Sequence, residues 1–181
     1  MSLKPDTVLE AGVIYGFVSN YLKYRGINVT TLDINKEVKP DVVGSVTSMP
    51  FKDSSFDIAA CFQVLEHLQF EEFEKALSEL SRVSRRHVII SLPDITRHIQ
   101  FYIKIPKIAE IKKILELPRF KDPVHVFDGQ HLWEIGKRGY SLNRILQCIN
   151  KKFNVVKTYR VFEMPYHRFF VLEKLSEKYK S

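Results

Sequence analysis

The chain has 181 residues, of which 45% are hydrophobic and 27% charged, and its formal net charge is +7. This length is typical of one domain, and these fractions are ordinary for a globular protein rather than a disordered or fibrous one. No apolar run approaches the roughly 18 residues of a membrane-spanning helix, and no secretory signal is visible. We therefore expect a single domain over residues 1–181.

The cysteines and the distribution of charge indicate a compartment and a kind of partner. Cys61 and Cys148 lie in apolar runs without metal or redox spacing, so we expect buried thiols in a cytoplasmic protein. Residues 1–92 carry 10 Lys and Arg against 12 Asp and Glu, whereas residues 93–181 carry 18 against 9. This asymmetry predicts either an anionic partner for the second half or simply a solvated basic surface.

Strand and helix signals alternate through the first half of the chain. Helical spacing of apolar residues predicts helices at Phe17–Arg25 and Phe70–Val83. Strands that alternate with helices favour right-handed connections and a parallel sheet. Apolar or β-branched runs predict the strands themselves at Thr7–Glu10, Ile27–Asp33, Val42–Val46, Phe56–Phe62 and His87–Leu92.

The segment 94–128 interrupts this alternation and mixes isoleucines with lysines. Pro106 and Pro118 bound a predicted short amphipathic helix from about Lys107 to Leu117. An insertion at this point is placed to cap an acceptor site, where it could hold a lipid-linked or anionic substrate at a membrane surface. The alternative is that its apolar side chains pack on the core while the lysines are solvated.

The end of the chain returns to regular structure. Tyr140–Asn150 is expected to form a helix with Ser141 near its N-cap. The connection between the predicted strands Phe153–Phe162 and Arg168–Leu175 is short enough for an antiparallel hairpin. The sequence thus predicts an α/β fold with a seven-stranded, mostly parallel sheet and a C-terminal antiparallel hairpin.

The first predicted strand, Thr7–Glu10, leads into a turn that is typical of a nucleotide pocket. The strand carries Glu10, and Gly12 and Gly16 follow before the first helix. Glycines let the backbone approach a ligand, and the following helix presents free N–H groups. Asp33 ends the second strand, where its carboxylate could bind both hydroxyls of a ribose or could simply begin a turn.

Four blocks and the terminal hairpin occur in the order found in one family. They are Val8–Gly16, Thr30–Ile34, Gly44–Phe51 and Ser55–Leu68. In this order they resemble the acidic-x-Gly-x-Gly-x-Gly motif, the ribose-binding strand, the adenine segment and the fourth strand of class I S-adenosylmethionine-dependent methyltransferases of the type 11 group. The resemblance implies a Rossmann-like doubly wound fold with S-adenosylmethionine as cofactor. It also implies methyl transfer to a small-molecule, glycan or lipid-linked acceptor.

The resemblance assigns cofactor contacts to residues of these blocks. Ile34 and Val46 would flank the adenine and Ser45 would accept from its amino group, while Phe62 and Gln63 would line the methionine end. Core packing is the competing interpretation for the apolar members. Glu10 orders the glycine loop, reaches the cofactor ammonium or forms an ion pair at the sheet edge. The full predicted set is Glu10, Gly12, Gly16, Asp33, Ile34, Ser45, Val46, Phe62 and Gln63.

Two histidines are the candidate bases, because an imidazole titrates near neutral pH. His67 follows the fourth strand and His131 lies in a cluster of polar and aromatic residues, although a structural role competes for both. Trp133 either contacts the acceptor or pins the loop to the core. The predicted acceptor contacts are Trp133, Glu134, Tyr166 and His167. The six histidines show no metal-ligand spacing, so no metal site is predicted.

Two departures from the family pattern leave other functions open. Ile14 replaces the middle glycine, and Ser45 stands where many relatives place an aspartate. The loop shifts to accommodate Ile14, or the protein is an inactive relative that keeps the fold as a binding module. A nicotinamide-binding enzyme is a further alternative, which the glycine spacing and terminal hairpin disfavour. No aromatic–basic stripe is present, so a nucleic-acid partner is not expected.

Overall fold

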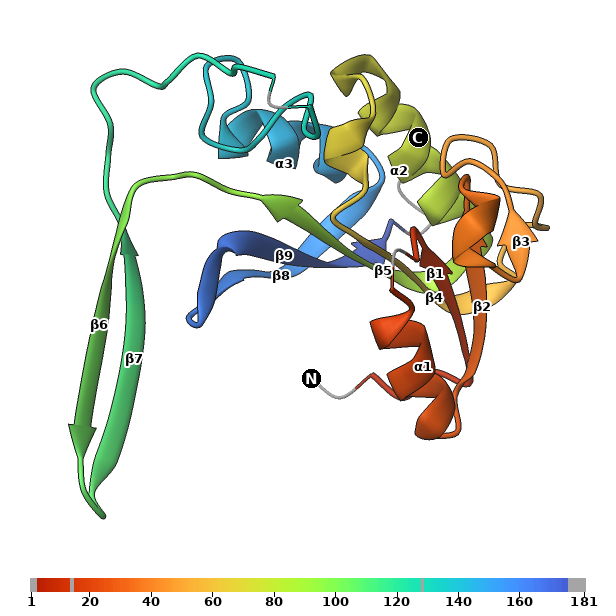
Figure 1. Ribbon diagram of the computed structural model, residues 1–181, viewed down its shortest axis with the longest axis horizontal. Helices are drawn as coiled ribbons and strands as arrows, with labels where there is room; N and C mark the ends of the chain where they lie inside the picture. Colours follow the sequence, from red (N-terminus) through yellow and green to blue (C-terminus); the bar gives the residue numbers. More distant parts are fainter. Residues whose placement is uncertain (1–2, 14, 128, 176–181) are drawn as a thin grey trace.

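The computed structural model describes residues 3–13, 15–127 and 129–175, in which seven strands form one mixed sheet (Figure 1). The strand order is β3-β2-β1-β4-β5-β9-β8. Neighbouring strands from β3 to β5 pair in parallel, whereas β9 and β8 pair antiparallel at one edge. The predicted fold class is confirmed. The strands are β1 (Thr7–Ala11), β2 (Asn28–Asp33), β3 (Val42–Val43), β4 (Phe56–Phe62), β5 (Ser84–Pro93), β8 (Phe153–Val161) and β9 (Met164–Lys174).

The helices form where the apolar spacing places them. In α2 (Phe70–Val83) the side chains at positions 73, 76, 77 and 80 are fully buried, which is the i, i+3, i+4, i+7 pattern of one helix face. In α3 (Leu142–Asn150) the Oγ of Ser141 accepts from the Arg144 N–H at 3.2 Å, as the N-cap prediction requires. The third helix in the described part, α1, spans Phe17–Tyr24.

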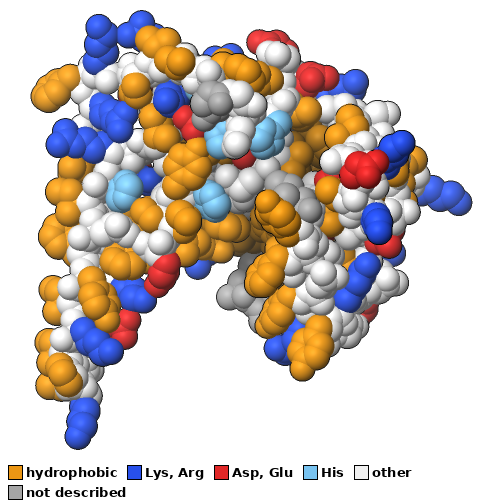
Figure 2. All heavy atoms as spheres, in the orientation of Figure 1, with side chains coloured by type: hydrophobic (Ala, Val, Ile, Leu, Met, Phe, Trp, Pro, Cys, Tyr) orange, Lys and Arg blue, Asp and Glu red, His pale blue; other side chains and the backbone are white. Residues whose placement is uncertain are grey.

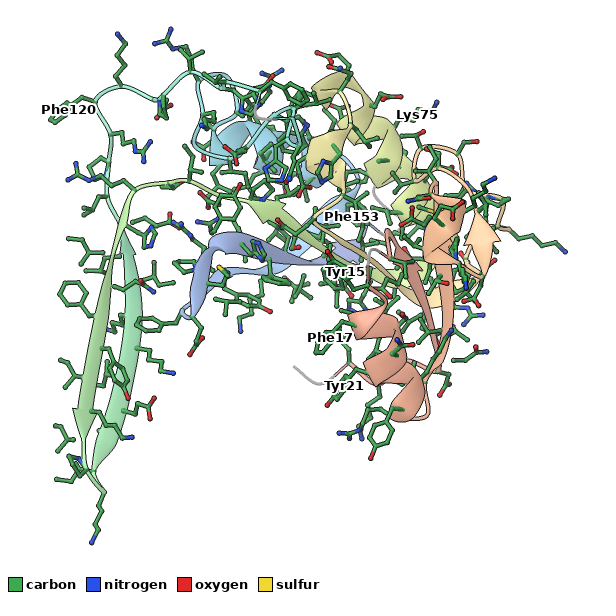
Figure 3. All side chains as sticks on the ribbon, viewed as in Figure 1. Tyr15, Phe17, Tyr21, Lys75, Phe120 and Phe153 are labelled. Carbon is green, nitrogen blue, oxygen red and sulfur yellow. The ribbon has the colours of Figure 1, made fainter. Side chains whose placement is uncertain are left out.

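Helices cover the two faces of the sheet unequally. Figure 1 shows α2 and α3 on one face and α1 on the other. The main core lies under α2 and α3, and Phe153 of β8 is buried there at 1% exposure (Figure 3). Both cysteines are buried thiols, as predicted. On the opposite face Phe17 and Tyr21 extend from α1 into solvent with 79% and 53% exposure (Figure 3).

The predicted helix at Lys107–Leu117 is wrong, because this segment belongs to a β-hairpin. Strands β6 (His98–Ile105) and β7 (Ala109–Glu116) pair antiparallel in a separate two-stranded sheet. Ile108 N–H donates to the Ile105 carbonyl at 3.0 Å, and Lys107 has a φ of 64°. Pro106 therefore occupies the first central position of a turn, and the isoleucines supply the β-branched side chains that strands favour.

The β6–β7 hairpin projects away from the large sheet (Figure 1). Its middle part is tied to the turn between β8 and β9, where Lys112 Nζ lies 2.7 Å from Glu163 Oε1 and the Gln100 side chain donates to the Phe162 carbonyl. Apolar side chains remain exposed along it, among them Ile103 at 52% and Tyr102 at 52%. Among the described residues, no helix is long and apolar enough to cross a membrane.

Candidate functional site

A crevice opens where the parallel strands end. Strand β1 lies between β2 and β4, so successive strands are added on one side of β1 up to β3 and on its other side from β4 onward. This is the topological switch point of the sheet, where open α/β sheets bind their ligands. The pocket at these ends has a volume of about 380 Å³, which suits a small ligand. It is lined by Ala11, Gly12, Leu32, Asp33, Ile34, Gly44, Ser45, Val46, Gln63, Val64, His67 and Leu68.

The two glycines of the first turn have different tasks. Gly12 has a φ of 87°, and a Cβ on it would lie 2.1 Å from Val64 Cγ2. Its N–H donates to the Leu32 carbonyl at 2.7 Å, so this residue joins the ends of three strands at the pocket floor. Gly16 caps α1 with a φ of 62° and does not line the pocket. Ile14, between them, lies outside the described residues, and its predicted effect on the loop stays a prediction.

Asp33 organises the loops on both sides of the pocket. Its Oδ2 accepts from the Val13 N–H at 2.7 Å, and its Oδ1 accepts from the Asn35 N–H at 2.8 Å. A carboxylate has about four acceptor positions, so both oxygens keep further capacity for a ligand. The adjacent Ile34 is 77% exposed and lines the same pocket as the buried Val46. Asp33 therefore combines a structural and a candidate binding role.

Ser45 and Gln63 both line this pocket. The Ser45 Oγ lies 2.9 Å from the Thr47 Oγ1 and accepts from the Thr47 N–H at 3.2 Å. Gln63 follows β4 with a φ of 54°, and its side-chain amide donates to Ser91 Oγ at 3.0 Å. Both residues thus line the pocket in positions fixed by neighbouring side chains.

Phe62 and Glu10 lie outside the pocket lining. The Phe62 ring packs against Phe169 with centroids 6.0 Å apart, which fits the packing alternative, and its predicted contact with the cofactor stays a prediction. Glu10 is 4% exposed, and its Oε2 has no hydrogen-bond partner in the described part of the chain. Burial raises the pKa of this carboxyl, and contacts with Ser19 and the charge of Lys23 offset only part of the effect.

The two candidate bases meet beside the pocket. His67 ends the short 3₁₀ turn η2 (Leu65–His67) and also lines the pocket. Its Nδ1 lies 2.8 Å from the Gln130 carbonyl oxygen, and its ring is edge-on to that of His131 with centroids 5.2 Å apart. The backbone N–H of Leu132 donates to the Glu66 carbonyl at 2.9 Å, which holds the loop around His131 against η2.

Glu134 connects two other predicted residues, Tyr166 and His131, and also contacts Lys137. Its Oε1 accepts from the Tyr166 hydroxyl and lies 3.2 Å from His131 Nδ1, while its Oε2 lies 3.4 Å from Lys137 Nζ. Burial alone would raise the pKa of this carboxyl, but the bonds from Tyr166 and His131 and the charge of Lys137 outweigh it and lower the pKa. The side chain is therefore an anion that orients the His131 ring.

Glu66 is a site residue that the sequence interpretation missed. It is fully buried beside His67, and neither carboxylate oxygen has a hydrogen-bond partner in the described part of the chain. Burial raises its pKa to about 8, its own backbone N–H opposes part of this rise, and the charge of Glu134 adds to it. Its position directly before a candidate base, four residues after the apolar strand β4, was the available signal.

Trp133 lies in the core, whereas His167 lies beside Tyr166 and its predicted acceptor contact stays a prediction. Trp133 is fully buried, its Nε1 donates to the Leu68 carbonyl at 3.0 Å, and its ring packs edge-on against Phe70 and Phe73. It pins the loop to the core, which was the alternative prediction. His167 is half-buried with its ring 5.6 Å from that of Tyr166, and burial followed by the charge of His131 lowers its pKa.

Basic side chains gather over the connection between β7 and α3 (Figure 2). A wider hollow there, of about 560 Å³, is lined by Arg97, Arg119, Lys121 and Arg138 among others. It lies apart from the strand ends and contains none of the predicted site residues. We regard the smaller crevice as the functional pocket, because it brings together the strand ends and the titratable cluster. The excess of basic residues in the second half of the chain is thus partly gathered around this hollow.

The fold is that of class I methyltransferases, as the solved structures described below indicate. Residues 9–92, from β1 to the end of β5, match the family model of the methyltransferase domain Methyltransf_11. The matched part contains every predicted cofactor-binding residue. The resemblance of the chain to the type 11 group of methyltransferases is thus confirmed.

Relatives of known structure support the same fold. A SAM-dependent methyltransferase from Methanosarcina mazei is 18% identical, with a TM-score of 0.64 over 97% of this chain and 95% of that one. The Burkholderia thailandensis 1,6-didemethyltoxoflavin-N1-methyltransferase, crystallised with its acceptor and S-adenosylhomocysteine, is 16% identical with a TM-score of 0.65. It is matched over 96% of this chain and 72% of that one.

One curated relative shares a stretch of sequence. An uncharacterised protein of Methanocaldococcus jannaschii is 32% identical over 85 residues. The match covers 44% of this chain and 36% of that protein, so the chain spans little more than a third of the length of this relative.

Proposed function

We propose that the crevice binds S-adenosylmethionine and that the protein transfers a methyl group to an acceptor held beside His67. The observation that carries this proposal is that four separate strand ends bring predicted cofactor residues into one pocket. Gly12 follows β1, Asp33 ends β2, Val46 follows β3, and Gln63 follows β4. Among proteins of similar fold, the Burkholderia thailandensis enzyme was crystallised with S-adenosylhomocysteine.

The residues of the crevice fit this cofactor chemically. Glu10 has a buried carboxylate oxygen without a partner in the described chain, and a cationic ammonium group nearby would offset the cost of its burial. Asp33 would accept from ribose hydroxyls with the lone pairs that its backbone partners leave. Ile34 and Val46 would flank the adenine, and Ser45 would accept from its amino group.

When bound, S-adenosylmethionine supplies a methyl group on a sulfonium whose sulfur leaves as a neutral thioether. The protein then has to align the acceptor, and good alignment is worth effective molarities of ~10⁵ M or more. His67 is held through Nδ1 by the Gln130 carbonyl, so its Nε2 would be the atom that takes a proton from an acceptor hydroxyl. His131 is the second candidate base, and the Glu134 carboxylate would stabilise its protonated form.

The acceptor is proposed to be a small molecule or a glycan or lipid-linked compound that is methylated on oxygen or nitrogen. Tyr166 and Glu134 would border it, because their network adjoins His131. The basic hollow at Arg119 and Arg138 is the surface that best suits an anionic group. Of the described residues, none from 94–128 lines the crevice, so capping by this segment remains a prediction.

Calorimetric titration tests the proposal directly. We expect S-adenosylmethionine and S-adenosylhomocysteine to bind with a Kd below roughly 1 mM, equivalent to about −4 kcal/mol, and NAD not to bind in this range. Absence of binding by both sulfur ligands would refute the proposed function. Binding of NAD alone would instead favour the nicotinamide alternative. Folding of each sample is checked by circular dichroism.

A further inference from the structure

Three side chains that can ligate metal ions converge at the edge of the crevice. Glu66, His67 and His131 each offer one ligand atom, and these atoms lie within 4.8 Å of one another. Glu66 and His67 belong to η2, whereas His131 comes from a loop 64 residues further along the chain. The backbone bond from Leu132 to Glu66 and the indole bond from Trp133 to Leu68 fix this loop on η2.

Both imidazoles are oriented by an acceptor at Nδ1. His67 Nδ1 lies 2.8 Å from the Gln130 carbonyl oxygen, and His131 Nδ1 lies 3.2 Å from the Glu134 carboxylate. An Nδ1–H that donates to such an acceptor puts the lone pair of the neutral ring on Nε2. Histidines that bind metals almost always carry a carboxylate or carbonyl partner of this kind on the other nitrogen.

Glu66 supplies the second, independent observation. Its side chain has no solvent exposure, and neither oxygen has a hydrogen-bond partner among the described residues. A buried polar group without a partner is costly, and native proteins contain few of them. One carboxylate oxygen lies within 4.8 Å of both histidine ligand atoms, where a bound cation would supply the missing partner.

We propose that Glu66, His67 and His131 bind a divalent transition-metal ion of the Zn²⁺ type. Two imidazole nitrogens and one carboxylate oxygen form a ligand set that Zn²⁺ and related ions accept, whereas Mg²⁺ and Ca²⁺ prefer oxygen ligands. Three protein ligands leave at least one coordination position open. His67 lines the crevice, so the open position adjoins it.

The role of the ion, unlike its binding, rests on the proposed function. An ion at this place would coordinate an oxygen atom of the acceptor and hold it at the edge of the crevice. With the ion bound, the Nε2 atoms of His67 and His131 would be metal ligands and could not act as bases. The ion itself would then activate the acceptor. Glu134 is a positioning residue in this arrangement, since it touches the ion only through His131.

Direct metal binding is the test. The full chain is stripped with a chelator and dialysed, and ZnCl₂ is titrated by calorimetry while bound zinc is counted by mass spectrometry. We expect one Zn²⁺ per chain with roughly micromolar affinity, and a Co²⁺-loaded sample should show ligand-field absorption of a nitrogen–oxygen site. The variants Glu66→Gln and His131→Asn should each lose affinity by about 100-fold or more, and Glu134→Gln by about 10- to 100-fold.

Matched controls separate this site from general effects. His98→Asn and Glu72→Gln alter the same residue types away from the cluster and should leave the zinc affinity unchanged. His67→Asn changes an exposed side chain, so it tests the site even where Glu66→Gln fails to fold. Absence of stoichiometric zinc, or equal affinity in the ligand variants and controls, would overturn the proposal. Zinc binding without S-adenosylmethionine binding would refute only the proposed function, and the reverse result only the metal site.

Discussion

Replacement of Gly12 by alanine tests how tightly the floor of the crevice is packed. The new Cβ would lie 2.1 Å from Val64 Cγ2, and the residue would keep a φ of 87°. A non-glycine residue in the left-handed region costs about 1–2 kcal/mol, and overpacking adds about 1–3 kcal/mol. We therefore expect Gly12→Ala to lower the free energy of unfolding by about 2–5 kcal/mol in urea denaturation.

Gly26 provides a matched control for the backbone contribution. It has a φ of 80°, and a Cβ on it would meet nothing within 4 Å. Gly26→Ala should therefore cost only the conformational part, about 1–2 kcal/mol. Combining Gly12→Ala with Val64→Ala should restore part of the loss, because it removes the clashing methyl groups. Equal destabilisation by Gly12→Ala and Gly26→Ala would contradict the packing that we describe.

Three further changes test other parts of the structure. Phe73→Ala removes a fully buried ring from α2 and should lower the free energy of unfolding by about 3–5 kcal/mol, whereas a loss below about 1 kcal/mol would disagree with its burial. The pKa of Asp57 is lowered to about 2, first by the hydrogen bond from Arg85 and then by the Thr7 N–H. The ionised Asp57 therefore stabilises the fold above the ordinary pKa near 3.8, and this stabilisation is lost as the pH falls toward 2. The Asp57→Asn variant should thus lose less stability than the parent between about pH 5 and pH 2, and an identical pH profile would argue against the shift. Glu66→Leu, measured with chelator present, should raise the free energy of unfolding by about 1–3 kcal/mol because it removes a buried carboxyl without a partner, and a decrease would show that Glu66 is satisfied without metal.

The parts of the fold that could be predicted have strong local signals. Phe56–Phe62 and Phe70–Val83 have the predicted bounds, because one is a continuous apolar run and the other repeats buried positions on one helix face. The segment at Lys107–Leu117 was misassigned, since Pro106 was interpreted as a helix boundary although it occupies a turn. Isoleucine and lysine in close alternation suit a helix stripe and a strand almost equally.

The site was predictable where its residues end strands and was missed where distant segments meet. Asp33, Ser45 and Gln63 follow strands whose parallel order already places their ends together. The contact between His67 and Gln130 joins residues 63 positions apart, and no spacing rule relates them. The two predicted roles of Trp133 could not be separated for a similar reason, because only the packed structure shows whether an aromatic ring in a polar loop faces the core.

The affinity of the Asp33→Asn variant for S-adenosylhomocysteine tests the central claim most directly. Asp33 is the acid that would bind the ribose, and charge-assisted hydrogen bonds are worth about 1.5–3 kcal/mol each. Glu37→Gln is the matched control, because it removes one negative charge from the exposed η1 turn (Lys36–Val38) nearby. We predict at least about a tenfold loss of affinity for Asp33→Asn and none for Glu37→Gln, in variants whose unfolding shows that they are folded. Unchanged affinity in a folded Asp33→Asn variant would contradict the assignment of this crevice as the cofactor site.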